Sequence, residues 1–147
     1  MKTFIAALII AVFLQTSFVP INLVLLFLIS RSLIFPQQSN LYLAFIFGIV
    51  LGILSGINIG FYAGVFLLAT QLSFLVKKTS FTANPLTVIP VSFLLLLMTA
   101  YFEQLFLNQA INFKIIFIES ALSVVIYLMV KFWEERFTVA PQVKLKL

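Results

Sequence analysis

Six apolar segments, separated by short polar or Gly- and Pro-containing breaks, make up most of the chain. The breaks fall at 17–22, 36–40, 56–60, 77–85 and 108–112. The apolar segments then run over about 4–19, 21–35, 41–56, 59–76, 88–107 and 113–132, near the 17 to 25 residues with which a helix crosses a bilayer. The pattern predicts an all-α membrane protein: one compact bundle of six transmembrane helices (1–132) and a short tail (133–147).

The first three segments are short for a perpendicular crossing. They could cross where the bilayer thins, or the first two could form a re-entrant hairpin. Lys2 and the apolar run after it also look like the start of a signal peptide. Because Gln15-Thr16-Ser17-Phe18 lacks a small-residue cleavage pattern, we expect a retained first helix.

The basic residues predict an orientation, since Lys and Arg gather on the cytoplasmic side of a membrane protein. If the N-terminus is cytoplasmic, only Lys114 lies outside. Eight basic residues then lie at the inner face: Lys2, Arg31, Lys77, Lys78, Lys131, Arg136, Lys144 and Lys146. This bias favours an even number of crossings, both termini in the cytoplasm, and a cytoplasmic tail that begins at Trp133.

Composition narrows the possible functions. The chain is 63% hydrophobic and 9% charged, whereas soluble domains are about 25% charged. It has no Cys and no His, which excludes disulfides, thiolate chemistry, Cys/His zinc sites and imidazole bases. Its four acidic residues are too few for a carboxylate metal cage. We therefore expect no enzyme activity, cofactor or metal. The net charge of +5 is scattered over helix ends, so nucleic acid is not an expected partner.

All five glycines follow one another at a spacing of four, and Ser55 accompanies them. The series is Gly48, Gly52, Gly56, Gly60 and Gly64. Neighbours four apart share a helix face, and small residues at this spacing let helix backbones approach closely in lipid. The series predicts either a docking face for a partner subunit or close packing inside the bundle.

Two acidic residues fall within the apolar segments. Glu103 lies near the outer end of the fifth and Glu119 about two turns into the sixth. Glu103 is the last residue of a polar stripe at helical spacing in the fifth segment, which begins with Ser92 and Thr99. Glu119 is the first residue of such a stripe in the sixth segment, which continues with Ser123, Tyr127 and Lys131. A carboxylate facing lipid costs at least about 2.5 kcal/mol at a helix centre, so each acid should face protein or water or be protonated. Three hypotheses remain for these acids: a proton relay, a substrate site and a polar contact to a partner. Interfacial solvation is a further hypothesis for Glu103.

Three further polar residues lie in or at the ends of apolar segments. Arg31 lies one turn before the end of the second, where its long stem can extend to the cytoplasmic interface and help to set orientation. Gln15 and Gln71 are expected to hydrogen-bond to neighbouring helices.

The glycine-rich stretch also resembles a known family. Gly48-Ile-Val-Leu-Gly52-Ile-Leu-Ser55-Gly56, followed by Ile59-Gly60, is similar to the G-x-x-x-D-x-x-S-G and Leu-Gly stretch of rod shape-determining protein MreD. Leu14-Gln15-Thr16-Ser17 is similar to the Leu-Gln-x-Ser that ends the family's first helix. The basic pair after the fourth segment also fits. The chain departs from the family at Gly52, where MreD proteins carry an acid, so no role of that acid transfers.

The resemblance implies a non-catalytic scaffold in the bacterial cytoplasmic membrane. It would join MreC and, through it, the peptidoglycan polymerase RodA, its transpeptidase and the MreB filament. It also implies a distant kinship with the substrate-binding subunits of energy-coupling-factor vitamin transporters. That alternative is supported by Ala7 and Ala11, which resemble the AxxxA motif by which those subunits grip their transport partner. A structural or pore-forming membrane protein without a family tie is the third possibility.

Overall fold

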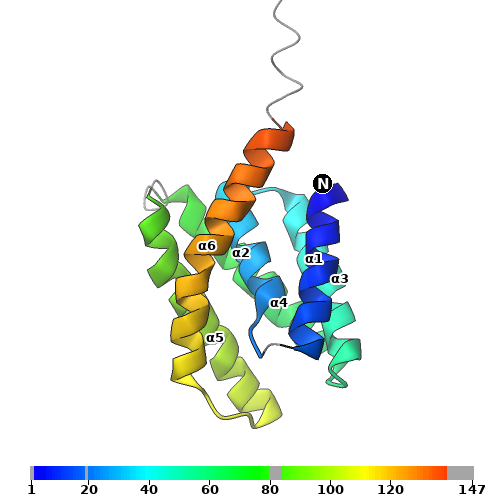
Figure 1. Ribbon diagram of the computed structural model, residues 1–147. Coiled ribbons are helices and arrows are strands. Elements are labelled where there is room, and N and C mark those ends of the chain that lie inside the picture. The colour runs from blue at the N-terminus through cyan, green and yellow to red at the C-terminus, as the bar shows by residue number, and fades with distance from the viewer. Residues whose placement is uncertain (1, 19, 80–83, 139–147) are drawn as a thin grey trace, which may run out of the picture.

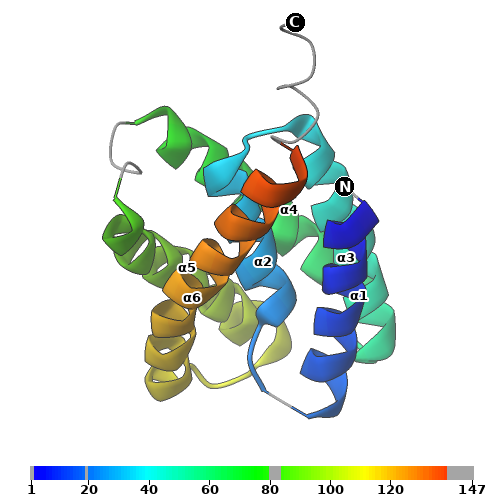
Figure 2. The ribbon, with the colours of Figure 1, turned by 45° about the horizontal axis from the view of Figure 1, so that its top comes forward.

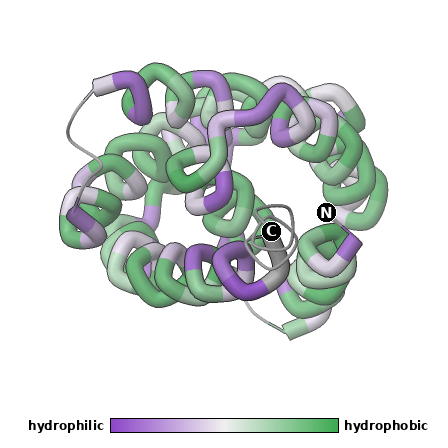
Figure 3. Tube along the Cα trace, turned by 90° about the horizontal axis from the view of Figure 1, so that it is seen from above, coloured by the Kyte–Doolittle hydropathy of each residue, from purple (hydrophilic) through white to green (hydrophobic). Residues whose placement is uncertain are grey.

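The computed structural model describes residues 2–18, 20–79 and 84–138. Within these ranges the chain is helical, and each of the six apolar segments predicted above coincides with one α-helix. The elements are α1 (Lys2–Ser17), α2 (Leu23–Ile34), α3 (Gln38–Leu54), α4 (Ile59–Lys78), the 3₁₀ turn η2 (Pro85–Thr87), α5 (Val88–Leu107) and α6 (Phe113–Thr138). Most of the helical trace is hydrophobic (Figure 3).

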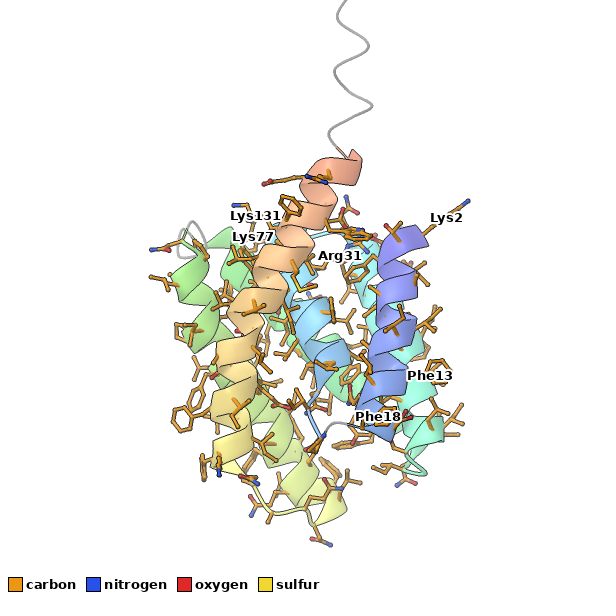
Figure 4. All side chains as sticks on the ribbon, viewed as in Figure 1. Lys2, Phe13, Phe18, Arg31, Lys77 and Lys131 are labelled. Carbon is orange, nitrogen blue, oxygen red and sulfur yellow. The ribbon has the colours of Figure 1, made fainter. Side chains whose placement is uncertain are left out.

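Successive helices run in opposite directions, so the start of α1 and the end of α6 lie at the same end of the bundle (Figures 1 and 2). The side chains of Lys2, Arg31, Lys77 and Lys131 lie at this end (Figure 4), which we call the basic end. Lys114, in the first turn of α6, belongs to the opposite end. The bundle therefore segregates its basic residues as the sequence predicts, although this by itself places no membrane around them.

Helix α2 lies at the centre of the bundle. It has twelve residues, of which nine are buried, and it packs against α1, α3, α4, α5 and α6. Twelve residues extend about 18 Å, well short of a hydrocarbon core of about 30 Å. Because other helices surround it, α2 does not need the length of a lipid-facing span. Its mostly aliphatic sequence is explained by burial against protein.

Helices α3 and α4 have the most extensive contact of the described helix pairs, and two glycines of α3 face α4 there. A Cβ added at Gly48 would lie 2.5 Å from Cα of Ala63, and one added at Gly52 would lie 3.2 Å from Cα of Ile59. Real Cβ atoms do not come as close to backbone atoms as the 2.5 Å that a Cβ at Gly48 would have to adopt. These two glycines therefore pack inside the bundle.

Gly56 has a different role, at the end of α3. It adopts a φ of 66°, a left-handed conformation that costs glycine little. The N–H of Gly56 bonds to the carbonyl of Ile53, and the N–H of Ile57 bonds to the carbonyl of Gly52. This pair of bonds is a Schellman motif, which caps the open carbonyls of a helix. Gly56 thus ends α3 and starts the tight turn into α4.

Three helices are long and apolar enough to span a membrane. They cover Ile59–Lys78, Pro85–Leu107 and Phe113–Arg136, whereas α1, α2 and α3 are shorter apolar helices. Large apolar side chains also cover the outside, among them Phe13, Phe18, Leu94 and Phe117, each more than half exposed. An outer surface of this kind is typical of a protein solvated by lipid.

Helix α6 differs from its predicted length. The sequence pattern ends the sixth segment at 132 and begins a tail at Trp133, whereas α6 continues to Thr138. The extension has a structural cause, because Glu134 in this added turn reaches back to α2, as described below. The rest of the predicted tail, 139–147, lies outside the described residues.

Candidate functional site

A polar cavity lies at the opposite end of the bundle, where the α1–α2 and α5–α6 connections come together. It consists of two adjoining chambers of ≈ 330 Å³ and ≈ 230 Å³ that share Asn22, Glu103 and Gln109. We call the two together the opposite-end cavity. The first chamber adds Gln15, Ser55 and Tyr62 to its polar lining, and the second adds Thr99, Asn112 and Glu119.

Glu119 is held in the wall of this cavity by the α1–α2 connection. Its side chain is buried, with an exposed fraction of 3%, and its Oε1 accepts a hydrogen bond of 2.7 Å from the backbone N–H of Asn22. Gln15 fixes the same connection from α1: its Nε2 donates to Oδ1 of Asn22 at 3.1 Å, and its Oε1 accepts from the backbone N–H of Val24 at 3.2 Å. The network joins α1, α2 and α6.

Glu103 lines the second chamber together with Glu119. It is half-buried and lines both chambers, and it is close enough for its charge to act on Glu119 and on the hydroxyl of Tyr62. Interfacial solvation stays one of the predictions for Glu103, and its carboxyl also shares a cavity with a second carboxyl. No ion pair joins either acid to a basic side chain among the residues that the structure describes.

The two polar stripes predicted from the sequence explain how these groups meet. Helices α5 and α6 pack side by side. On α5, Ser92 and Thr99 are buried; on α6, Glu119, Ser123 and Tyr127 are buried, and only Lys131, at the basic end, is exposed. Polar residues at helical spacing therefore turn inward on both helices, away from the surface that would meet lipid.

Arg31 is not the interfacial side chain that the sequence predicted. Its exposed fraction is only 4%. Its Nε lies 3.4 Å from Oε1 of Glu134, and its guanidinium lies 4.4 Å from the centre of the Phe4 ring. A buried guanidinium needs such partners, because burying an unpaired charge costs several kcal/mol. Arg31 therefore links α1, α2 and α6 at the basic end, as the Gln15–Asn22–Glu119 network does at the opposite end.

The last two glycines of the series, unlike Gly48 and Gly52, face outward. A Cβ added at Gly60 or Gly64 would meet nothing within 4 Å. At 100° per residue they lie within about 80° of three other exposed residues of the helix. We call this set the α4 outer stripe: Gly60, Gly64, Leu68, Gln71 and Leu75.

Gln71 departs from its predicted role. Its amide was expected to bond to a neighbouring helix, but it is exposed on the α4 outer stripe and has no hydrogen bond to any described residue. The reason is its position on α4: the residues packed against α3 and α2, such as Phe66, Ala69 and Thr70, lie on the opposite side of the helix.

Ala7 and Ala11 lie beside an apolar groove. A cavity of ≈ 380 Å³ is bounded by α1 and α6 and has Leu23 and Phe27 of α2 at its base; both alanines line it. At the basic end it continues into a smaller cavity of ≈ 120 Å³ beside Trp133. The small-residue spacing noted in the sequence therefore borders a surface groove.

Several site residues were missed by the sequence reasoning. Asn22, Gln109 and Asn112 were read only as breaks between helices, and Glu134 was assigned to a flexible tail. The spacing Tyr127, Lys131 and Glu134 continues the helical period of α6 and could have placed Glu134 on the helix. Within the described ranges, no group of three or more His, Cys, Asp or Glu side chains could hold a metal ion.

Comparison with known proteins adds no relative: no family model, curated protein or solved structure matches the chain. The fold and the site together define the class of protein. The described residues form an all-helical bundle with three helices able to span a membrane and a polar cavity at one end.

Proposed function

We propose that the protein is a non-catalytic scaffold subunit of the bacterial cell-wall elongation complex, in which it docks MreC and, through MreC, the peptidoglycan polymerase RodA, its transpeptidase and MreB. The resemblance of the glycine-rich stretch to MreD supports the choice of complex. The α4 outer stripe supports the mechanism, which is lateral docking of a partner's transmembrane helix.

The observation that carries this proposal is the exposed amide of Gln71 on the same stripe as Gly60 and Gly64. Gln71 lies within a helix long and apolar enough to span a bilayer, and it has no hydrogen bond among the described residues. Leaving an amide without a partner in an apolar medium costs about 1–3 kcal/mol by mutational measures. A partner helix that hydrogen-bonds to Gln71 would remove this cost.

The two glycines make such an approach possible. Because they carry no side chain, a neighbouring helix could lie close to the α4 backbone and gain contact along its length. Leu68 and Leu75 flank Gln71 and would supply apolar contact on both sides of the polar one. The glycines would then set the distance between the helices, and the amide would set their register.

In this proposal all six helices are embedded in the bacterial cytoplasmic membrane, with the basic end in the cytoplasm. Both chain ends then lie inside, as the asymmetry of Lys and Arg favours. In this arrangement α2 is enclosed by the other helices, and α1 and α3, with 16 and 17 residues, would cross where the bilayer thins locally.

Co-purification with MreC tests the proposal. We expect Gly64→Leu and Gln71→Leu each to reduce recovery of MreC at least tenfold, because one blocks close approach and the other removes the hydrogen bond. Neither should disturb the fold, since both positions face outward. Ala121→Leu, at an exposed position of α6, adds similar bulk elsewhere and should leave recovery unchanged.

Unchanged recovery of MreC in both stripe variants would refute docking at this face. If the chain purified alone is a dimer that Gly64→Leu dissociates, the stripe joins two copies, and the proposal loses its structural support. Gly48→Leu and Gly52→Leu are poor tests, because both residues pack inside the bundle and their substitution would damage the fold first.

A second candidate function is the substrate-binding subunit of an energy-coupling-factor vitamin transporter. The opposite-end cavity favours it, because the cavity collects polar groups from several helices, among them Gln15, Tyr62 and Glu119. The groove beside Ala7 and Ala11 would then receive the transport partner. Stable association with an ATPase-driven module, and its loss in Ala7→Leu, would support this function over the scaffold.

A further inference from the structure

The opposite-end cavity contains two carboxyl groups, and no basic side chain lies among the described residues of its lining. Glu119 is almost fully buried and Glu103 is half-buried, and the charge of Glu103 acts on Glu119. Two carboxylates that line one chamber repel each other, and a proton or a cation would offset their charge.

Hydrogen bonds hold polar groups of the cavity wall in fixed positions. The backbone N–H of Asn22 holds one oxygen of Glu119, and Gln15 holds Asn22 and Val24, so the carboxyl is fixed in place before any ligand arrives. Neutral polar groups surround the acids, including Thr99, Gln109 and Asn112. Both acids line the second chamber, of ≈ 230 Å³, and the adjoining chamber of ≈ 330 Å³ gives room for the rest of a small molecule.

The lining chemistry selects the kind of cation. Ca²⁺ takes six to eight oxygen ligands, and within the described ranges no group of three or more His, Cys, Asp or Glu side chains could hold a metal ion. An ammonium group donates three hydrogen bonds and carries one positive charge, which suits acceptors arriving from two helices. The amides and hydroxyls around it can bond to the rest of a small polar molecule.

We propose that the opposite-end cavity binds a small ligand through a primary ammonium group, which lies between the carboxyls of Glu103 and Glu119. Glu119 is the fixed acceptor. Glu103 is the more exposed acceptor and completes the site when the ligand enters. The inference rests on the cavity alone and holds whether or not the protein is a scaffold.

The test uses the full chain in detergent at constant ionic strength, with two probes of equal length. 1,4-Diaminobutane carries ammonium groups, whereas 1,4-butanediol carries neutral hydroxyls. We expect the diamine to raise the melting temperature in a saturable way and the diol to have no such effect. Glu103→Gln should weaken the diamine effect at least tenfold, because it keeps the side-chain size and removes the charge.

Glu135→Gln is the matched control, since it removes an exposed carboxylate near the basic end, far from the cavity. Its response to the diamine should equal that of the unaltered chain. An equal response to diamine and diol, no saturable response to either, or an unaltered response in Glu103→Gln would overturn the proposal. Each of these results leaves the MreC experiment unaffected, so the two proposals fail independently.

The same assay, repeated in lipid nanodiscs, distinguishes two sources of the ammonium group: a lipid headgroup and a soluble amine. Phosphatidylethanolamine carries a primary ammonium group and phosphatidylcholine does not. Competition between phosphatidylethanolamine and the diamine would identify a lipid headgroup as the occupant. Equal diamine binding in both lipids would identify a soluble amine.

Discussion

The carboxyl of Glu119 on α6 accepts a hydrogen bond from the backbone N–H of Asn22, although 97 residues separate them in the sequence. This bond ties the connection between the first two helices to the last one. It also places the most buried acid of the opposite-end cavity at the point where the chain leaves α1 and enters α2.

We expect Glu119→Ala to be less stable than Glu119→Gln by about 1–3 kcal/mol, because the alanine leaves the N–H of Asn22 without an acceptor in a buried site. Glutamine keeps an oxygen in the same place. Unfolding in mixed detergent micelles measures the difference. Equal unfolding free energies for the two variants would mean that the bond contributes nothing to the bundle.

Arg31 and Glu134 form a second link, and we expect it to behave as a buried pair. Arg31→Met should destabilise the bundle by about 3–5 kcal/mol, since it removes the guanidinium that lies beside the buried carboxyl of Glu134. The double variant Arg31→Met/Glu134→Leu should recover most of this loss. A double-mutant cycle on the unfolding free energy measures the coupling.

Arg136→Met is the control for that cycle. Arg136 is exposed and lies 4.7 Å from the centre of the Phe132 ring, so its loss should change stability by no more than about 0.5 kcal/mol. If Arg31→Met has as small an effect, the guanidinium does not hold the helices together.

Alanine substitutions in the glycine series should change the free energy of unfolding in opposite directions. Gly48→Ala must push α3 away from α4, because the new Cβ would lie 2.5 Å from Cα of Ala63; we expect a loss of about 1–3 kcal/mol. Gly64→Ala meets open space and replaces a poor helix former, so it should gain up to about 1 kcal/mol. The same unfolding assay compares the two, and a shared sign would contradict the packing described for α3 and α4.

The proposed orientation can be read directly, because the chain contains no cysteine. We expect Lys114→Cys to react with a membrane-impermeant maleimide in intact bacterial cells. Lys78→Cys, at the basic end, should react only after the membrane is permeabilised. Labelling of Lys78→Cys in intact cells would place the basic end outside and invert the topology.

The helices were largely predictable from the sequence, because their breaks carry local signals. Pro20, Pro36 and the turn at Gly56 interrupt the apolar runs, and the helices of the structure begin and end near them. The end of α6 was placed too early because the segment 133–136 is polar enough to suggest a tail. The spacing of Glu134 from Lys131 and Tyr127 is a local helical signal, whereas the contact of Glu134 with Arg31 joins residues far apart in the sequence.

The inward direction of the polar stripes on α5 and α6 could be anticipated, since lipid penalises exposed polar groups. The direction in which single glycines of α3 and α4 face could not be anticipated. Spacing alone puts Gly48, Gly52, Gly60 and Gly64 in one series, but the turn at Gly56 separates them onto two antiparallel helices. Only the arrangement of α3 against α4 shows that the first two face inward and the last two outward.

The central position of α2 has a consequence for how the protein is made. A helix of twelve residues is too short to halt in a bilayer by itself, so α2 would enter the membrane as a hairpin with α1. Its enclosure is finished only by α6, which follows the other five helices along the chain and packs against it. A chain truncated before α6 would hold Arg31 without the carboxyl of Glu134 and would leave the face of α2 that α6 covers without its cover.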